Sequence, residues 1–508
     1  MNRSRLFLIL LVFCLLAVDA RAHIGSPDVF FDGKIGPYSA KVTIRVPPVV
    51  PGRAEIDVRP ASDRPVQVSI LPLFSKTSLK NSPPPEPALP AAEEAGLYRG
   101  DLWLMRSGGY SVEVKIHGDF GEGVVQIPVN SVATHQLPVP RYLAVALIGL
   151  AGLLVIGGLA IVRAAAGEST LPPDTALDSS HRRKGLIAVT LTAFLCLGSL
   201  AGGRYWWNAE EASFRKHLRE GAWPDLAAEV RTEGGQRILH LTVGETTFGP
   251  HYTIPLLTDH GKLLHVFLIG KDGNRSVAHL HPIRQGGKVF EVALPPLPEG
   301  DYRVFVDLTL SDTGLSSTTT ASIHLPPVPS GSSPSGALRV DPDDSWATCT
   351  APVEANATDT APAYHFEDGL QLLWKPHRPL RARHDAGLQF EVCDAAGQPV
   401  TLEPYMGMIS HAAVMRADGS VFAHLHPAGN FSMAAQSFFE SKVAKEDSGT
   451  AMPLEMMDHS KMHHGGTMTL SAFDLPYEFP SAGDYHLWVQ FKTAEQVHTA
   501  RFDVTVAP

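Results

Sequence analysis

The chain has 508 residues, of which 44% are hydrophobic and 19% charged, and its formal net charge is −10. This length predicts about three domains, and the composition excludes a long disordered or fibrous chain. A mild negative charge without a basic stripe argues against a general nucleic-acid-binding protein. The chain has 23 His, and nine of its 11 Met lie between Met406 and Met468, a clustering that needs a cause because core Met residues are normally scattered.

Residues 1–22 have the pattern of a secretory signal peptide. Arg3 and Arg5 form a basic start, an apolar run covers 6–18, and residues 20–22 fit a small-x-small cleavage site. An uncleaved anchor is the alternative. Cleavage after Ala22 would make His23 the N-terminus of an exported chain.

Two further apolar runs predict transmembrane helices at 141–163 and 185–204, because each uncharged stretch is long enough to cross a bilayer. The uncharged runs themselves are 142–162 and 185–203; within ten residues of their ends, four Lys or Arg lie on the loop side and two lie on the other side. This asymmetry predicts a cytoplasmic loop. The large domains would then lie on the periplasmic or extracellular side of a bacterial inner membrane.

The exported parts are predicted to be all-β. Segments such as 41–46 and 110–116 alternate polar and apolar residues between turn clusters, which is typical of a β-sandwich. We expect a short amphipathic helix within 208–232. The whole pattern predicts three immunoglobulin-like sandwiches with a two-helix transmembrane hairpin between the first and second. Their ranges are 23–140, 205–327 and 345–508, with a Pro/Ser/Gly-rich linker at 328–344.

An ordered repeat links the second and third domains. Each copy has a His, an Asp-Gly turn, a His-x-His-Pro motif and a Gly-Asp-Tyr motif. A two-residue loop at 418–419 would place His411 opposite His426, and a three-residue loop at 272–274 would place His265 opposite His281. Side chains two apart share a strand face. We therefore predict one three-His metal site in each domain, the first from His265, His279 and His281, and the second from His411, His424 and His426.

Imidazole accepts Zn, Cu, Fe or Ni, so these sites do not identify the metal. Ordinary hairpin histidines that bond to the backbone are the alternative. The more informative stretch is the Met/His loop, residues 452–468, because Met in a polar, turn-rich loop is unlike core Met. Thioethers select Cu(I). The candidate ligands in this loop are Met456, Met457, His459, Met462, His463, His464 and Met468.

A flexible Met-rich surface for protein contacts is the alternative interpretation of the Met/His loop. His23 is a separate candidate, because an N-terminal His offers its amino group and ring as a chelate; His117, Asp119 or His135 could add a ligand. Cys349 and Cys393 could form one disulfide in an oxidising compartment or remain free thiols.

The run Met457-Asp-His-Ser-Lys-Met462 resembles the Met-Asp-His-Ser-x-Met repeats of bacterial periplasmic copper-resistance proteins of the CopA and CopB type. An exported β-sandwich that begins at His23 is similar to CopC-like proteins, which implies that His23 is a Cu(II) ligand. The segments 404–411 and 424–427 look like YtkA-like immunoglobulin-like modules, over roughly 390–508 and more weakly 236–327. These resemblances imply exported β-sandwiches that handle metal.

We therefore predict a membrane-anchored protein that captures, buffers or hands over copper in the bacterial envelope, with zinc as the second candidate metal. Envelope copper-transport proteins would be its partners. No acid or base stands at fixed spacing from the histidines, so we predict no catalytic residues. A metal-free module that binds a protein partner and a His-site metalloenzyme are the two alternatives.

Overall fold

The computed structural model describes residues 28–134, 137–172, 175–222, 224–244, 252–271, 273, 275–328, 341–349, 351–355, 361–375, 379–448 and 471–508. Strands account for 46% of the described residues and helices for 20%. The predicted β-rich chain with two long apolar helices is confirmed. The chain divides into two compact units, one formed by 135–221 and the other by the residues up to 134 together with 222–508.

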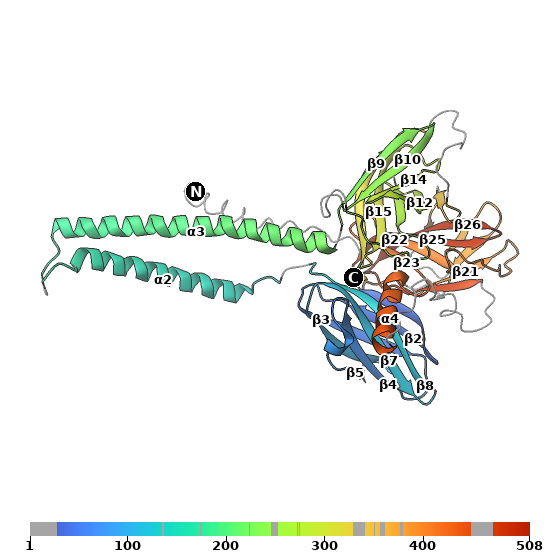
Figure 1. The fold of residues 1–508 in the computed structure, drawn as a ribbon, viewed down its shortest axis with the longest axis horizontal. Helices are drawn as coiled ribbons and strands as arrows, with labels where there is room; N and C mark the ends of the chain where they lie inside the picture. Colours follow the sequence, from blue (N-terminus) through green and yellow to red (C-terminus); the bar gives the residue numbers. More distant parts are fainter. Residues whose placement is uncertain are drawn as a thin grey trace. The chain divides into compact units, whose positions relative to one another are not determined.

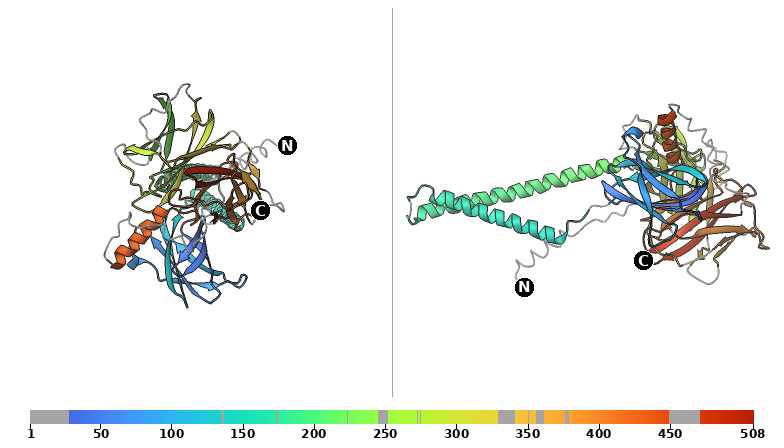
Figure 2. Two further views of the ribbon diagram at one scale, coloured as in Figure 1. Left: turned by 90° about the vertical axis from the view of Figure 1, so that its right-hand side faces the viewer. Right: turned by 90° about the horizontal axis from the view of Figure 1, so that it is seen from below.

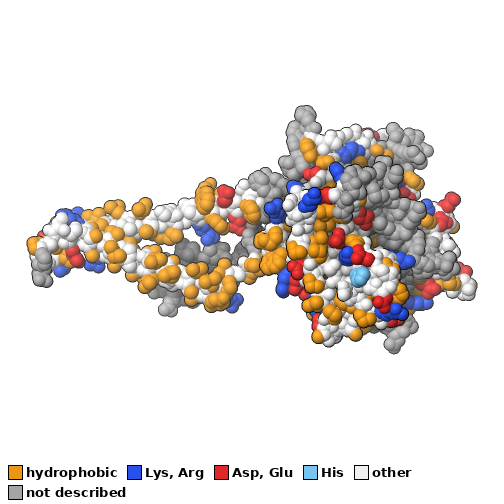
Figure 3. Space-filling model, turned by 60° about the horizontal axis from the view of Figure 1, so that its bottom comes forward, with side chains coloured by type: hydrophobic (Ala, Val, Ile, Leu, Met, Phe, Trp, Pro, Cys, Tyr) orange, Lys and Arg blue, Asp and Glu red, His pale blue; other side chains and the backbone are white. Residues whose placement is uncertain are grey.

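The unit 135–221 contains the two long helices, α2 (Arg141–Glu168) and α3 (Ser179–Ala222). Both are long and apolar enough to cross a membrane. Their large hydrophobic side chains are exposed; Ile148 is 72% and Leu195 is 70% accessible. Figure 3 shows hydrophobic side chains along both helices. A helix with exposed apolar residues on all sides is typical of a membrane span rather than of a surface helix.

The helix expected within 208–232 is right only in its first part. Helix α3 ends at Ala222, and β9 (Leu226–Glu233) follows. Strand β9 pairs with β10 (Gln236–Val243) along its whole length, from Leu226 opposite Val243 to Glu233 opposite Gln236. Its side chains alternate between half-buried and exposed, so a strand that joins a sheet replaces the end of the predicted helix.

The first strand-rich region of the larger unit is one eight-stranded sheet in the order β1-β2-β3-β6-β5-β4-β7-β8. The segment predicted as a strand at 41–46 lies in β2 except for its last residue, and the segment 110–116 lies within β7. The strands are β1 (Val29–Ile35), β2 (Tyr38–Arg45), β3 (Gly52–Pro60), β4 (Gln67–Phe74), β5 (Glu86–Pro90), β6 (Tyr98–Leu104), β7 (Gly108–Gly118) and β8 (Gly121–Ser131).

The second region has a four-stranded sheet, β13-β14-β10-β9, and a five-stranded sheet, β16-β15-β11-β12-β17. Leu241 and Phe290 from the first sheet and Val266 and Val304 from the second belong to one hydrophobic core. The remaining strands are β11 (His265–Gly270), β12 (Ser276–Leu280), β13 (Ile283–Gly286), β14 (Val289–Ala293), β15 (Gly300–Thr309), β16 (Ser316–Leu325) and β17 (Ser345–Thr348). Strand β17 pairs with β12, although the sequence places 345–348 in the third domain.

The third region has a five-stranded sheet, β18-β26-β25-β22-β23, and a four-stranded sheet, β19-β20-β21-β24. A helix that the sequence did not predict, α4 (Met433–Ser448), lies between β23 and β24, and Met433 packs into the core of the first region. The strands are β18 (Val353–Glu354), β19 (Ala363–His365), β20 (Gln371–Trp374), β21 (Leu388–Cys393), β22 (Ser410–Arg416), β23 (Phe422–Leu425), β24 (Ala472–Leu475), β25 (Gly483–Thr493) and β26 (Gln496–Val506).

The two five-stranded sheets pack against each other, and this contact positions the site. Each sheet turns one face to the core of its own region and the other face to a shared cluster that includes Phe267, Phe305, Phe422 and Trp488. The rings of Phe305 and Phe422 stack with centroids 4.2 Å apart. Figures 1 and 2 show the second and third groups of strands in contact. Because β11, β12, β22 and β23 are buried on both faces, residues on their shared face meet the other sheet.

Candidate metal centre

The two hairpins have the registers that the sequence predicts. In the earlier copy Val266 lies opposite Leu280, and in the later copy Ala412 lies opposite Leu425. These registers place the first His of each copy, one residue before these pairs, opposite the second His of the His-x-His motif. Side chains two residues apart share a strand face. The histidines of both hairpins therefore lie on the faces that meet between the two sheets.

The two predicted sets of histidines converge in one chamber rather than in two separate sites. The ring of His265 lies 5.4 Å from that of His424, and the ring of His279 lies 6.1 Å from that of His411, measured between centroids. We call this group the histidine chamber. Its members are His260, His265, His279, His281, His411, His424 and His426.

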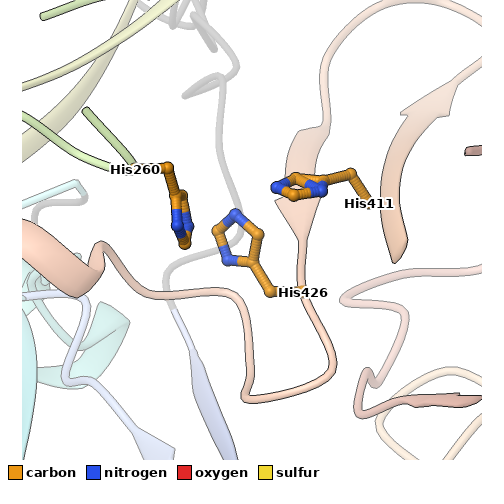
Figure 4. Close-up of side chains that lie close together, drawn as sticks. All are labelled: His260, His411 and His426. Carbon is orange, nitrogen blue, oxygen red and sulfur yellow. The ribbon is translucent and has the colours of Figure 1, made fainter. Parts of the chain in front are cut away.

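His260 is the member that the sequence analysis missed. It lies in a tight turn in which Asp259 and Lys262 exchange backbone hydrogen bonds, and its φ of 51° is uncommon for a residue other than glycine. Figure 4 shows its ring beside those of His411 and His426. One nitrogen from each of these three rings lies within 4.8 Å of the others. A left-handed backbone conformation at such a place is typical of functional sites.

The earlier hairpin supplies the set that we call the first set, His265, His279 and His281, whose ligand nitrogens also lie within 4.8 Å of one another. Asp344 accepts a hydrogen bond from the backbone of His281 at 2.8 Å and lies 3.0 Å from its Nδ1. The Nε2 atom of His281 has no hydrogen-bond partner among the described residues. A carboxylate on the outer nitrogen is how proteins orient a metal-binding imidazole.

Two further hydrogen-bond partners fix the rings of this first set. The Nε2 of Gln490 donates to the hydroxyls of Ser345 and Thr499, so its Oε1 accepts from the Nδ1 of His279 at 3.1 Å. The Nε2 of His265 lies 3.1 Å from the carbonyl oxygen of Asp259. These bonds leave the Nε2 of His279 and the Nδ1 of His265 on the inner side, 3.2 Å apart.

His424 lies between the two sets. Its Nδ1 is 3.3 Å from Asp307, and its Nε2 has no hydrogen-bond partner among the described residues. Its ring centroid lies 4.5 Å from that of His426 and 5.3 Å from that of His279. His424 can therefore add a ligand to the set formed by His260, His411 and His426. Its ring also contacts His279 of the other set.

The electrostatics of the histidine chamber favour neutral imidazoles. Burial, followed by the neighbouring histidines, holds the pKa of His279 and His411 well below the usual value. The pKa of His281, His424 and His426 is lowered well below that value for the same reasons. Neutral imidazole has the free lone pair that a metal requires.

Unsatisfied polar atoms mark the later hairpin. Within the described part of the chain, neither ring nitrogen of His411 or His426 has a hydrogen-bond partner. Both side chains are buried, and a buried polar group without a partner costs about 1–3 kcal/mol. A fold that leaves four such nitrogens beside the five other imidazoles of the histidine chamber fits a cation-binding site.

A smaller group, His281 with Asp341 and Asp344, also lies within metal-binding distance. Lys262 already pairs with Asp341 at 2.6 Å and with Asp343 at 3.0 Å. Burial raises the pKa of Asp344 to about 7. This group is therefore an ion-pair cluster that supports His281 rather than an independent site.

A family model described as a domain of unknown function (DUF8832) matches residues 365–508. No curated protein matches the chain. Salmonella alpha-2-macroglobulin reacted with methylamine is 10% identical over 96% of this chain and 24% of its own, with a TM-score of 0.19. Escherichia coli alpha-2-macroglobulin activated by porcine elastase is 9% identical over 92% and 44%, with a TM-score of 0.18. The chain thus spans under half of either protein, and TM-scores this low do not establish a shared fold.

The other predicted ligands lie outside the described residues. They are His23, Met456, Met457, His459, Met462, His463, His464 and Met468. Cys349 and Cys393 are buried free thiols, so the structure has no disulfide between them. Of the sites predicted from the sequence, the structure therefore describes the two His sets, and it places both in the histidine chamber.

Proposed function

We propose that this protein is a membrane-anchored copper-binding protein whose ion is held in the histidine chamber. The observation that carries the proposal is the convergence of seven imidazoles with little or no solvent exposure, in which four nitrogens on His411 and His426 have no partner among the described residues. Without a bound ion this arrangement would cost free energy, because a ring nitrogen that is buried loses its hydrogen bond to water. This argues against a metal-free module that only binds protein partners.

Copper is the metal that the donors favour. Within the described residues the inner ligands of the histidine chamber are all imidazole nitrogens, which suit copper and zinc equally. The Met/His loop 452–468 follows α4 in the same domain, and its thioethers select Cu(I). A protein that pairs a Met-rich segment with a buried His site is therefore better matched to copper than to zinc.

We place the strand-rich unit outside the cytoplasm of a bacterial cell, at the inner membrane, with α2 and α3 as the anchor. Basic residues such as Arg182 and Arg183 lie in the first turns of α3, between the two uncharged runs of the sequence, which supports a cytoplasmic loop. We also propose that the second and third regions, each with two packed sheets, are immunoglobulin-like sandwiches, and that the single eight-stranded sheet of the first region folds into a third. In this setting the protein would capture or buffer copper and exchange it with envelope copper-transport proteins.

Competition for Cu(I) against a coloured chelator, with the full chain in detergent, tests the proposal. The double variant His265→Leu/His411→Leu removes one ligand from each set; it and its control carry Ala in place of His23 and of the seven candidate ligands of the Met/His loop, so that only the histidine chamber is measured. Its Cu(I) affinity should fall by more than the 10–100-fold that loss of a supporting partner causes. His324→Leu is the matched control, because His324 is an exposed strand histidine bonded to Asp301. Equal Cu(I) affinity in the double variant and the control would contradict the proposal.

The membrane placement has its own test. Protease added to spheroplasts should digest the strand-rich unit and leave a fragment that contains α2 and α3 with the membrane. Protection of the strand-rich unit in intact spheroplasts, with digestion only after lysis, would contradict the proposed orientation.

A further inference from the structure

The histidine chamber contains more ligands than one ion uses. A copper or zinc ion in a protein takes about four ligands of this kind, whereas seven imidazoles converge here. They fall into two sets with no common member: His265, His279 and His281 form one, and His260, His411 and His426 form the other. Each set alone provides the three imidazoles of a metal site.

The rings are closer within each set than between the sets. Centroids within the first set are 4.7–5.4 Å apart, and those within the second are 5.0–5.5 Å apart. Between the sets, His260 lies 6.1 Å from His265 and His279 lies 6.1 Å from His411. Metal–imidazole bonds of about 2.0–2.1 Å require the nitrogens of one site to crowd around one point. Two metal positions a few ångströms apart fit these ring distances better than one metal position does.

The seventh imidazole and the surrounding carboxylates suit two cations. His424 contacts both sets and turns a free Nε2 to the interior, so it completes a fourth position at one of the ions. Asp344 contacts the first set through His281, Asp307 contacts His424, and Asp259 lies 3.5 Å from the second set at His260. Carboxylates spread along the chamber reduce the repulsion between two cations in it.

We infer that the histidine chamber binds two copper ions at once, one in each set. The inference rests on the proposed function, because it assigns the number and position of the ions at the same site. The first ion would be held within the second region of the chain. The second ion would bridge two regions, because His260 belongs to the second region and His411 and His426 to the third.

Copper analysis of the full chain in detergent tests the inference. The background carries Ala in place of His23 and of the seven candidate ligands of the Met/His loop, so that only the histidine chamber is counted. After Cu(I) loading and removal of loose metal, the expected content is two copper per chain. The variants His265→Leu/His281→Leu and His411→Leu/His426→Leu should each retain one. His324→Leu in the same background should retain two.

The same sample supplies a measurement that needs no variant in the chamber. After oxidation to Cu(II), two ions a few ångströms apart couple their spins, so the electron paramagnetic resonance signal should account for less copper than metal analysis does. One copper per chain with a full-intensity signal would overturn the inference and leave the proposed function standing. No bound copper would overturn both. A cooperative thermal unfolding transition of each apo variant shows that it folds.

Discussion

The two His-bearing hairpins carry the same motif, yet their surroundings differ. In β11–β12 the outer nitrogens of the rings have partners: Asp344 for His281, Gln490 for His279 and a backbone carbonyl for His265. Among the described residues, only His424 of the β22–β23 hairpin has a comparable partner, Asp307. The earlier copy therefore has its rings oriented in advance, while the later copy depends on His260 from the other region. The same motif therefore gives one set whose rings are held by hydrogen bonds and one set whose nitrogens are available to a metal ion.

The largest expected effect tests what the two hairpins share. Phe422 stacks on Phe305 in the cluster between the sheets. Phe422→Ala should lower the free energy of unfolding by about 3–5 kcal/mol and weaken copper binding by both sets. Denaturant unfolding and copper analysis of the full chain measure this. The control is Phe120→Ala, because Phe120 is an exposed aromatic residue. Loss of copper from only one set would show that the two hairpins do not depend on this contact alike.

Copper loading is the next largest effect. A ligand that binds only the native state at 100 times its dissociation constant adds about 2.7 kcal/mol to stability. Because one set contains residues of both regions, copper should raise the midpoint of thermal unfolding for these regions together, and a chelator should reverse the rise. If only one transition in calorimetry shifts, the ion does not bridge the two regions.

Removal of the carboxylate behind the earlier copy should have a smaller effect. Asp344→Asn keeps the shape but loses the charge that orients His281, so copper affinity at the first set should fall about 10–100-fold. Competition titration with a Cu(I) chelator measures this. Asp301→Asn removes the same contact from the exposed His324 and should change nothing. Equal effects of the two substitutions would show that Asp344 does not support a ligand.

The smallest effect distinguishes the copies without metal. His279→Leu removes the donor to the Oε1 of Gln490, so the apo protein should lose about 1 kcal/mol of stability. His411→Leu removes two nitrogens that have no partner among the described residues, so it should leave the stability unchanged or raise it. Thermal unfolding of both apo variants gives the comparison. Equal losses would show that the two hairpins do not differ in their hydrogen bonding.

The sequence could predict the registers of both hairpins, because loop length and the two-residue repeat of a strand determine which side chains share a face. It could not predict that the two faces meet. Both β11 and β22 are apolar on each face, so the residue pattern does not say which face covers the core of its own region. His260 was missed for another reason: it lies in a turn outside the repeat, and only the fold brings that turn to the later hairpin.

The contacts across the histidine chamber are reciprocal. His265 meets His424 and its counterpart His411 meets His279, while the two equivalent residues His279 and His424 meet each other. This is the pattern of an isologous interface, in which a surface pairs with a second copy of itself. A protein with a single domain of this kind would have to form a two-fold homodimer to bury the same six imidazoles. Tandem duplication in one chain makes that pairing independent of protein concentration and lets one half acquire His260 without the other.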